Sequence, residues 1–516
     1  MGPEEPRPEF EELLERRAAM SDEARTEAVQ KRRARGRRTA RENVADLCDK
    51  GTFVEYGALA VAAQRSRRSI EDLVAKTPAD GLIGGIGKIE GRPCAVLSYD
   101  YTVLAGTQGA VNHRKKDRLF DVIARLKLPV VLFAEGGGGR PGDTDVPTVS
   151  GLDTMAFALF ARLSGLVPSI GVASGYCFAG NAALLGCCDL IIATADANIG
   201  MGGPAMIEAG GLGAHPPEEI GPAPMHARTG SVDVLVADDA EAVTTAKTLL
   251  SYFGDRAGSW DESDQAILRT AVPEHRRTAY DPRPVIETIA DPGSVTELRR
   301  EFGRTIVTGL ARVEGRPVGI FANDSRRLGG AIDSEGADKA ARFMALCDAH
   351  GLPIVSLCDT PGFMVGPKAE ETAQVRHFAR MFVTGASVTV PYITVVLRKG
   401  YGLGAQAMAG GSFHAPLLTV SWPTGEFGGM NLEGAVRLGF RKELDSIEDP
   451  TDRENAFEAM VAEAYQRGKA LNLASHFEID DVIDPADTRG VIADMLASCP
   501  PRPIRDGKKR PLVDPW

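Results

Sequence analysis

The chain contains two copies of one sequence pattern, separated by a constant number of residues. Gly91 and Gly315 lie 224 positions apart, as 315 minus 91. The same spacing separates Gly106 from Gly330, Pro129 from Pro353, and Glu135 from Asp359. The register therefore survives three intervening segments without an insertion. This repetition predicts that a single domain was duplicated.

The agreement continues along the chain with a slip of one residue. Val167-Pro168 corresponds to Val390-Pro391 at a spacing of 223, as 390 minus 167. Segments 171–182 and 394–405 then align, and each passes from a β-branched apolar run through small residues into a helix-like stretch. Both copies are thus predicted to contain a strand, a tight turn and a helix in that order.

The size and composition of the chain suit two α/β domains. Its 516 residues exceed what one hydrophobic core usually supports, and 43% of them are hydrophobic. We expect one domain over residues 1–278 and a second over 279–516, because prolines cluster between the copies as they do in linkers. These prolines are Pro273, Pro282, Pro284 and Pro292.

Charge and composition argue against several classes of protein. A net charge of −11 disfavours general nucleic-acid binding. The chain has no apolar run of 18 residues, and its first twenty residues carry six acids and three arginines, so we expect a cytoplasmic protein without a membrane span. The eight cysteines lack zinc-binding spacing, so we expect free thiols and no metal.

Glycine-rich turns before helices are the main candidates for chemistry. Such a turn directs unpaired backbone N–H groups outward, and the helix dipole adds positive potential, so the turn suits a developing anion. The matched turns at Gly180-Asn181 and Leu403-Gly404 predict two oxyanions held in one reaction. A phosphate-binding loop is a weaker alternative because the G-x-x-x-x-G-K pattern is missing. Close helix packing alone is a further alternative.

Acid–base side chains are hard to nominate. The eight histidines occupy no repeat-matched positions, and neither G-x-S-x-G nor H-E-x-x-H occurs, which disfavours hydrolases and metalloproteases. His226 follows a Pro- and Gly-rich loop and is the best functional histidine, although a structural role is at least as plausible. Glu135 and Asp359 end strands at matched positions, where capping or turn stabilisation explains them better than catalysis.

The chain resembles the carboxyltransferase β subunits of biotin-dependent acyl-CoA carboxylases, which act on propionyl-, acetyl-, methylcrotonyl- or long-chain acyl-CoA. The resemblance covers nearly the whole length and includes Asp359-Thr360-Pro361-Gly362. The other matching segments are 39–43, 47–55, 84–93, 226–230, 315–320, 340–343, 398–402 and 422–424.

The resemblance implies two tandem crotonase-like domains of spiral ββα turns, related by internal duplication. It also implies a hexamer whose active sites combine the first domain of one subunit with the second domain of another. Gly180 and Asn181 would hold the acyl-CoA thioester, and Leu403 and Gly404 the biotin carbonyl. Residues expected to contact the substrates are Gly137, Gly138, Ala179, Gly402, Ala405, Gln406, Arg114 and Lys115, the last two through CoA phosphates.

Carboxybiotin would come from a separate carrier, because the chain has no Ala-Met-Lys-Met biotinylation motif. The expected partners are therefore a biotin carboxylase and a biotin carboxyl carrier, with no metal in this subunit. Both turns depart from the common family pattern: Asn181 replaces a glycine in the first, and Leu403 and Gln406 replace a glycine and an aspartate in the second. Asn181 could contact the thioester, and Leu403 and Gln406 point to a longer or functionalised acyl chain. A decarboxylase with the same fold and a non-catalytic scaffold remain alternatives.

Overall fold

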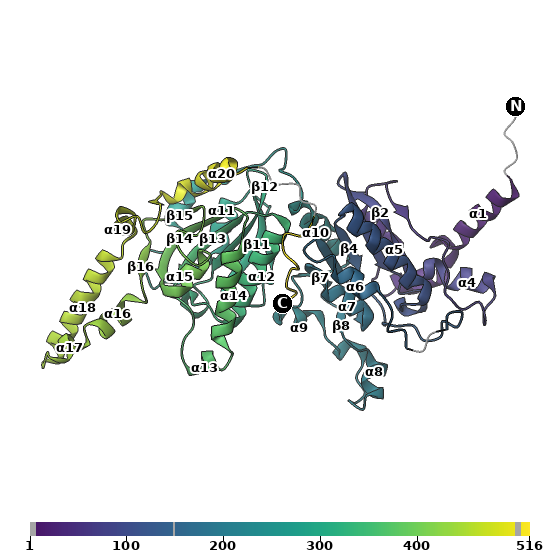
Figure 1. Ribbon diagram of the computed structural model, residues 1–516, viewed down its shortest axis with the longest axis horizontal. Coiled ribbons are helices and arrows are strands. Elements are labelled where there is room, and N and C mark those ends of the chain that lie inside the picture. Colours follow the sequence, from purple (N-terminus) through teal and green to yellow (C-terminus); the bar gives the residue numbers. More distant parts are fainter. Residues whose placement is uncertain (1–6, 148–149, 501–506) are drawn as a thin grey trace. The chain divides into compact units, whose positions relative to one another are not determined.

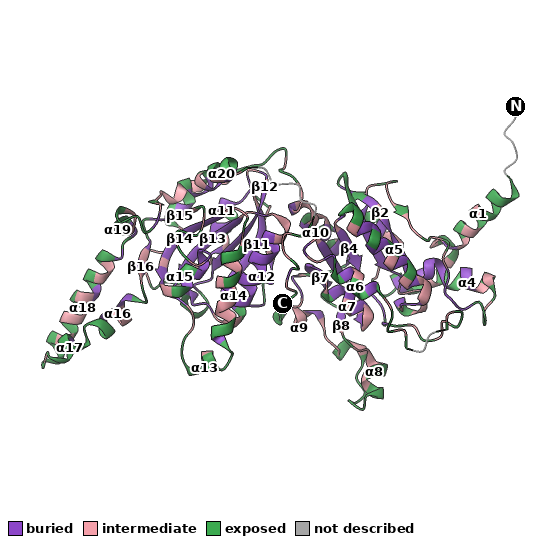
Figure 2. Ribbon diagram, viewed as in Figure 1, coloured by how far each residue is buried: buried purple, intermediate pink, exposed green. Residues whose placement is uncertain are grey.

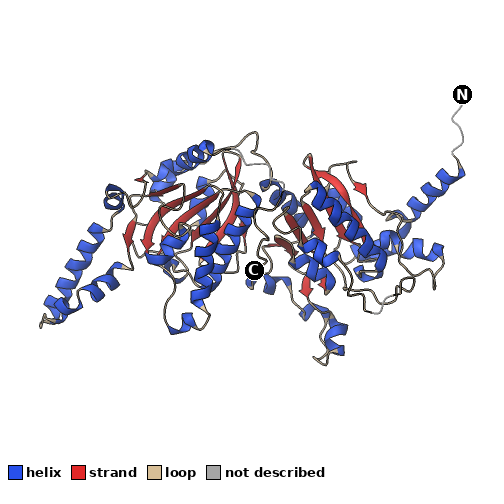
Figure 3. Cartoon of the chain, viewed as in Figure 1, coloured by secondary structure: helices blue, strands red, loops and turns tan. Residues whose placement is uncertain are grey.

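The computed structural model describes residues 7–147, 150–500 and 507–516. It divides into two compact units, of which the first comprises residues 1–251 with 511–515 and the second residues 252–510 with Trp516. This division falls between Ser251 and Tyr252, earlier in the chain than the linker expected near residue 278. Each unit combines one large sheet with helices (Figures 1 and 3).

The first unit is built on a seven-stranded sheet with strand order β1-β2-β3-β4-β5-β7-β9. Its strands are β1 (Val54–Glu55), β2 (Leu82–Ile89), β3 (Arg92–Tyr99), β4 (Val130–Phe133), β5 (Ser169–Ala173), β7 (Leu190–Thr194) and β9 (Val234–Val236), while β6 (Tyr176–Phe178) pairs with β8 (Asn198–Gly200). Its helices are α1 (Pro8–Ala19), α2 (Thr26–Arg33), α3 (Ala40–Leu47), α4 (Ile70–Lys76), α5 (Ala110–Leu126), α6 (Ala156–Ala161), α7 (Gly180–Gly186), α8 (Pro204–Ala209), α9 (Ala223–Arg228) and α10 (Asp239–Tyr252).

The second unit repeats this plan on an eight-stranded sheet with the main order β10-β11-β12-β13-β14-β15-β17. Its strands are β10 (Thr296–Leu298), β11 (Ile306–Val313), β12 (Arg316–Asn323), β13 (Ile354–Thr360), β14 (Tyr392–Tyr401), β15 (Leu418–Ser421), β16 (Glu426–Gly428) and β17 (Asp481–Val482). Its helices are α11 (Arg283–Ile289), α12 (Ser334–His350), α13 (Pro367–Glu370), α14 (Gln374–Ser387), α15 (Gly402–Met408), α16 (Leu432–Gly439), α17 (Arg441–Asp445), α18 (Pro450–Arg467), α19 (Ala470–Ser475) and α20 (Thr488–Ser498).

The two units are duplicates at the level of single elements. In each, the first three strands pair antiparallel, β1-β2-β3 and β10-β11-β12, and the following strands pair parallel. Helices α5 and α12 both contain 17 residues, and their first residues, Ala110 and Ser334, lie 224 positions apart. The predicted α/β architecture of tandem ββα domains is confirmed.

The parallel strands are buried because helices cover them (Figure 2). Strand β4 reads Val-Val-Leu-Phe and is buried along its whole length. Leu97, Phe120 and Leu132 belong to the core of the first unit, and Ile320 and Trp422 to that of the second. In the described part of the chain, no helix has the length and apolar character needed to cross a bilayer.

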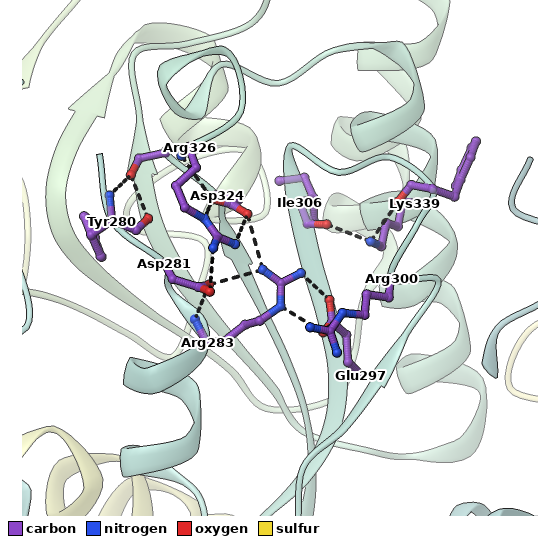
Figure 4. A network of polar contacts seen from close by, with 11 residues as sticks. Tyr280, Asp281, Arg283, Glu297, Arg300, Ile306, Asp324, Arg326 and Lys339 are labelled. Carbon is purple, nitrogen blue, oxygen red and sulfur yellow. Dashed lines mark hydrogen bonds and ion pairs between the residues drawn. The ribbon is translucent and has the colours of Figure 1, made fainter. Parts of the chain in front are cut away.

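Two buried lysines mark equivalent positions in the duplicated helices. Lys115 Nζ donates hydrogen bonds to the carbonyl oxygens of Ala79 and Leu82, at 2.8 and 2.5 Å. Lys339 Nζ lies 224 positions later and donates to the carbonyl oxygen of Ile306 at 2.8 Å (Figure 4). Both amines therefore join the helix to the start of a strand in the adjoining sheet.

Burial of Lys339 makes stability depend on pH. Burial lowers the pKa of Lys339 to about 7, whereas an unfolded lysine has a pKa of about 10.4. Between these values the unfolded state binds a proton that the folded state does not, so the free energy of unfolding rises with pH. We expect Lys339→Met to flatten this rise between about pH 7 and pH 10 in denaturant titrations. Parallel pH curves for the variant and the wild type would contradict the assignment.

Candidate functional site

The first glycine turn, residues 179–182, joins β6 to α7. Ala179 has φ 50° and ψ −121°, a conformation that is rare for a residue with a side chain. This bend begins the helix at Gly180 and leaves the N–H groups at its start free of intrahelical partners. Among the described residues, none accepts a hydrogen bond from the backbone N–H of Gly180 or Asn181. The turn therefore presents donors suited to an oxyanion.

A glycine after strand β4 allows a second segment to approach this turn. Gly138 has φ +88°, and a Cβ placed on it would lie 2.6 Å from the Cβ of Ala179. A side chain at position 138 would therefore push the two segments apart. Gly137 is exposed, and its backbone N–H donates to the carbonyl oxygen of Ala105 at 3.1 Å.

The side chain of Asn181 joins these segments and is fully buried. Its Oδ1 accepts a hydrogen bond from the Gly138 backbone N–H at 3.0 Å. Its Nδ2 donates to the carbonyl oxygens of Glu135 at 3.0 Å and Gly106 at 3.3 Å. The expectation that this side chain contacts the thioester is wrong, because the amide is used inside the protein. Only the backbone of Asn181 faces the turn.

The second glycine turn, residues 402–405, joins β14 to α15 and has the same construction. A Cβ on Gly404 would lie 2.7 Å from the backbone of Gly362, and one on Gly402 would lie 2.8 Å from the Gly429 carbonyl oxygen. Leu403 is 63% exposed. Within the described ranges, the backbone N–H groups of Leu403 and Gly404 have no hydrogen-bond partner. Ala405 is buried, and Gln406 is exposed beyond the turn.

Both turns are supported in equivalent ways. Gly138 and Gly362 lie 224 positions apart, each follows a parallel strand, and each contacts the start of a short helix. Glu135 forms a buried ion pair with Arg32 at 2.6 Å. Asp359, its counterpart, forms one with Arg398 at 2.9 Å. These acids are held in structural ion pairs, so neither caps a helix nor offers a free carboxylate to a substrate.

The two cations predicted to contact CoA phosphates differ in position. Arg114 is exposed on α5 and stays available for such a contact. Lys115 is buried, with its amine bonded to the two carbonyl oxygens described above, so its predicted phosphate contact is wrong. Sequence spacing placed both residues on one helix, but adjacent helical residues point in different directions.

Histidines contribute little acid–base chemistry near the turns. His226 Nε2 lies 2.8 Å from the carbonyl oxygen of Ile199, which is a structural contact. His113 lies on α5, where burial and the nearby Lys116 lower its pKa to about 4, so it is neutral at pH 7. The described residues contain no cluster of three or more His, Cys, Asp or Glu side chains arranged to bind a metal.

Sequence reasoning missed Gln108 and Phe157 beside the first glycine turn, and it considered Lys116 only as one of the cations on the helix near that turn. A Cβ on Gly180 would lie 3.2–3.3 Å from the Gln108 amide and 3.2 Å from Phe157 Cζ. The Gln108 amide is in turn bonded to Lys116. The repeat did distinguish Gln108 and Lys116. The residues 224 positions later are the apolar Ile332 and Ala340, so these two polar side chains belong to the first copy alone. Phe157 lies where the spacing between copies changes, so the repeat gave no corresponding signal.

Comparisons with known proteins agree on one family. Residues 31–509 match the model of the carboxyl transferase domain. The methylmalonyl-CoA carboxyltransferase 12S subunit of Propionibacterium freudenreichii subsp. shermanii is 35% identical over 500 residues, covering 94% of this chain and 93% of the subunit. A solved transcarboxylase 12S hexamer, with methylmalonyl-CoA bound, has a TM-score of 0.85 at 33% identity and covers 97% of this chain and 98% of its own.

A solved single-chain, multi-domain long-chain acyl-CoA carboxylase is more similar in sequence. It is 59% identical with a TM-score of 0.90, and the match covers 95% of this chain. The chain spans about half of that protein, as the match covers 49% of its length.

Removing the Asn181 amide should destabilise the first unit. Asn181→Ala leaves the Gly138 N–H and two carbonyl oxygens without their buried partner, and we expect a loss of about 2–4 kcal/mol in the free energy of unfolding. Denaturant titration measures this loss, with the exposed Gln406→Ala as a control expected to change stability by less than about 0.5 kcal/mol. An equally small change in Asn181→Ala would contradict the structural role.

Proposed function

Since this chain belongs to the carboxyl transferase family, we propose that it transfers a carboxyl group from carboxybiotin on a separate carrier to an acyl-CoA thioester. The observation that carries the proposal is the pair of equivalent glycine turns, each with two backbone N–H groups that have no hydrogen-bond partner among the described residues. A reaction between a thioester and a biotin urea places a reacting carbonyl on each partner. Two oxyanion sites match that requirement, whereas hydrolysis of a single ester needs one.

We assign the first glycine turn to the thioester and the second to the biotin carbonyl. The N–H groups of Gly180 and Asn181 would stabilise negative charge on the thioester oxygen as the α-carbon loses its proton. Those of Leu403 and Gly404 would bind the oxygen of the biotin ring. A single donor of this kind typically contributes about 2.7–4 kcal/mol to a transition state.

In this proposal the carboxyl group and the acceptor for the α-proton come from the carrier and not from side chains of this protein. Carboxybiotin would supply the carboxyl group, and its ring nitrogen, once free of that group, could take the α-proton. This division suits a chain whose matched acids are already in buried ion pairs. The protein's own contribution is then to fix both carbonyl groups against preorganised dipoles and to exclude water. Gly138 at the first turn and Gly404 at the second support this task by letting the flanking segments approach each turn.

We further propose a long-chain acyl-CoA as the substrate. The support is the 59% identity to a long-chain acyl-CoA carboxylase, well above the 35% identity to a methylmalonyl-CoA enzyme. Exposed Leu403 adds apolar surface at the second turn. The partners would be a biotin carboxylase and a biotin carrier, whether as separate chains or as domains, and self-association into a hexamer follows the 12S relative.

A substitution that displaces the backbone N–H donors of the second glycine turn tests the proposal. The protein is mixed with biotin carboxylase, biotinylated carrier, ATP and labelled bicarbonate, and label incorporation is measured for acetyl-, propionyl-, methylcrotonyl- and palmitoyl-CoA. We expect incorporation with palmitoyl-CoA in the wild type. In Gly404→Ala the new Cβ meets the Gly362 backbone at 2.7 Å and displaces the donors, so incorporation should fall at least about 100-fold.

A matched glycine provides the control for this experiment. A Cβ on Gly439 at the end of α16 meets no atom within 4 Å, so Gly439→Ala should retain activity. Absence of label in every thioester, with the carrier shown to be carboxylated, would contradict the proposal. Release of carbon dioxide from a carboxylated acyl-CoA would then support a decarboxylase. Binding of the thioester without turnover would support a non-catalytic scaffold.

A further inference from the structure

The Gln108 side chain lies against the first glycine turn with an unused donor. Its oxygen and nitrogen would be 3.2 and 3.3 Å from a Cβ on Gly180, so the amide borders that residue directly. The side chain is 97% buried, since its exposure is 3%. Within the described ranges, Nε2 has no hydrogen-bond partner. A buried amide nitrogen without a partner is unfavourable, so Nε2 has a donor available for a water molecule or a bound ligand.

Lys116 fixes the orientation of this amide. Its Nζ donates a hydrogen bond to Gln108 Oε1 at 2.8 Å. Because Oε1 accepts this hydrogen bond, Nε2 points away from Lys116. The aromatic ring of Tyr99 lies beside the same ammonium, 5.6 Å from ring centroid to Nζ. The cation also polarises the amide and strengthens Nε2–H as a donor.

Charged groups from three segments surround Lys116. Asp117 on its own helix and Asp80 favour its charged form, whereas Arg140 and burial oppose it. Asp80 and Arg140 themselves form a buried ion pair. Burial lowers the pKa of Lys116 to about 7. An anion bound beyond Gln108 would add a further negative charge and favour the ammonium.

The second copy shows that the fold does not require this pair. Ile332 stands 224 positions after Gln108, and its backbone N–H donates to the Gly362 carbonyl oxygen at 3.0 Å. The backbone N–H of Gln108 makes the same bond to Gly138, at 2.7 Å. Lys116 corresponds to Ala340, which is buried. The backbone role is therefore shared by both copies, while at these two matched positions the amide and the amine occur in the first copy alone.

We propose that Gln108 is a third donor of the first glycine turn, whose Nε2–H binds the thioester oxygen of acyl-CoA, and that Lys116 is the residue that positions it. This inference rests on the function proposed above. It makes the two turns unequal, since the thioester turn combines two backbone donors with a side-chain amide and the second turn has no such amide at position 332. Phe157, 38% exposed, also packs against Gly180, and we expect its ring to turn outward when the thioester reaches Nε2.

The test removes the donor while keeping the partner of Lys116. In Gln108→Glu a carboxylate still accepts the lysine hydrogen bond but has no N–H. We expect kcat for acyl-CoA carboxylation to fall about 100-fold, while KM for acyl-CoA changes less than about threefold, because the bond matters most once charge develops on the oxygen. The exposed Gln466→Glu on α18 makes the same chemical change within the second unit and should leave kcat unchanged.

Two further variants separate positioning from folding. Lys116→Met keeps the donor but releases the amide, so kcat should fall about 10-fold with KM little changed. The double variant Gln108→Ile with Lys116→Ala installs the residues of the second copy, and should match the wild type in thermal unfolding while losing kcat as Gln108→Glu does. A wild-type kcat in Gln108→Glu, or a rise in KM alone, would overturn the inference. Failure of the wild type to carboxylate any acyl-CoA would instead refute the function on which it rests.

Discussion

The close packing of a strand-following glycine against the start of a short helix is the contact on which both candidate sites depend. Gly138 meets Ala179 in the first unit, and Gly362 meets Gly404 in the second, each at a distance that excludes a further carbon atom. This approach places the helix start, with its unpaired N–H groups, at the end of a buried parallel strand. Rigid backbone donors in a partly enclosed position stabilise developing charge without having to reorganise.

Duplication gave two copies of this contact, and the surroundings then diverged. The two helices that follow the antiparallel strand pairs have equal length, and each inserts a buried lysine, Lys115 or Lys339, that bonds to backbone carbonyls. Around the first turn the Asn181 amide ties three segments together, and the Gln108 and Lys116 side chains lie beside it. At the positions of Gln108 and Lys116, the second copy has an isoleucine and an alanine. This divergence at matched positions is the physical basis of our proposal that the two turns bind different carbonyl groups.

The two-domain architecture was predictable from sequence. The constant spacing of 224 residues between the two copies can be read from the identity and order of the residues alone. The strand–turn–helix order around Gly180 and Gly404 followed from local composition. The direction of single side chains did not, since Asn181 and Lys115 are polar residues that the fold buries against backbone groups distant in sequence. Gln108 was overlooked because polar residues are usually exposed, and only the three-dimensional contact with Gly180 distinguishes it.

The most direct test of this account is a crystal structure of the protein with a non-hydrolysable palmitoyl-CoA analogue and biotin bound together. The account predicts the carbonyl oxygen of the thioester analogue within hydrogen-bond distance of the Gly180 and Asn181 N–H groups. It predicts the biotin carbonyl oxygen at the N–H groups of Leu403 and Gly404. Exchange of the two ligands between the turns, or binding of either carbonyl away from both, would contradict it.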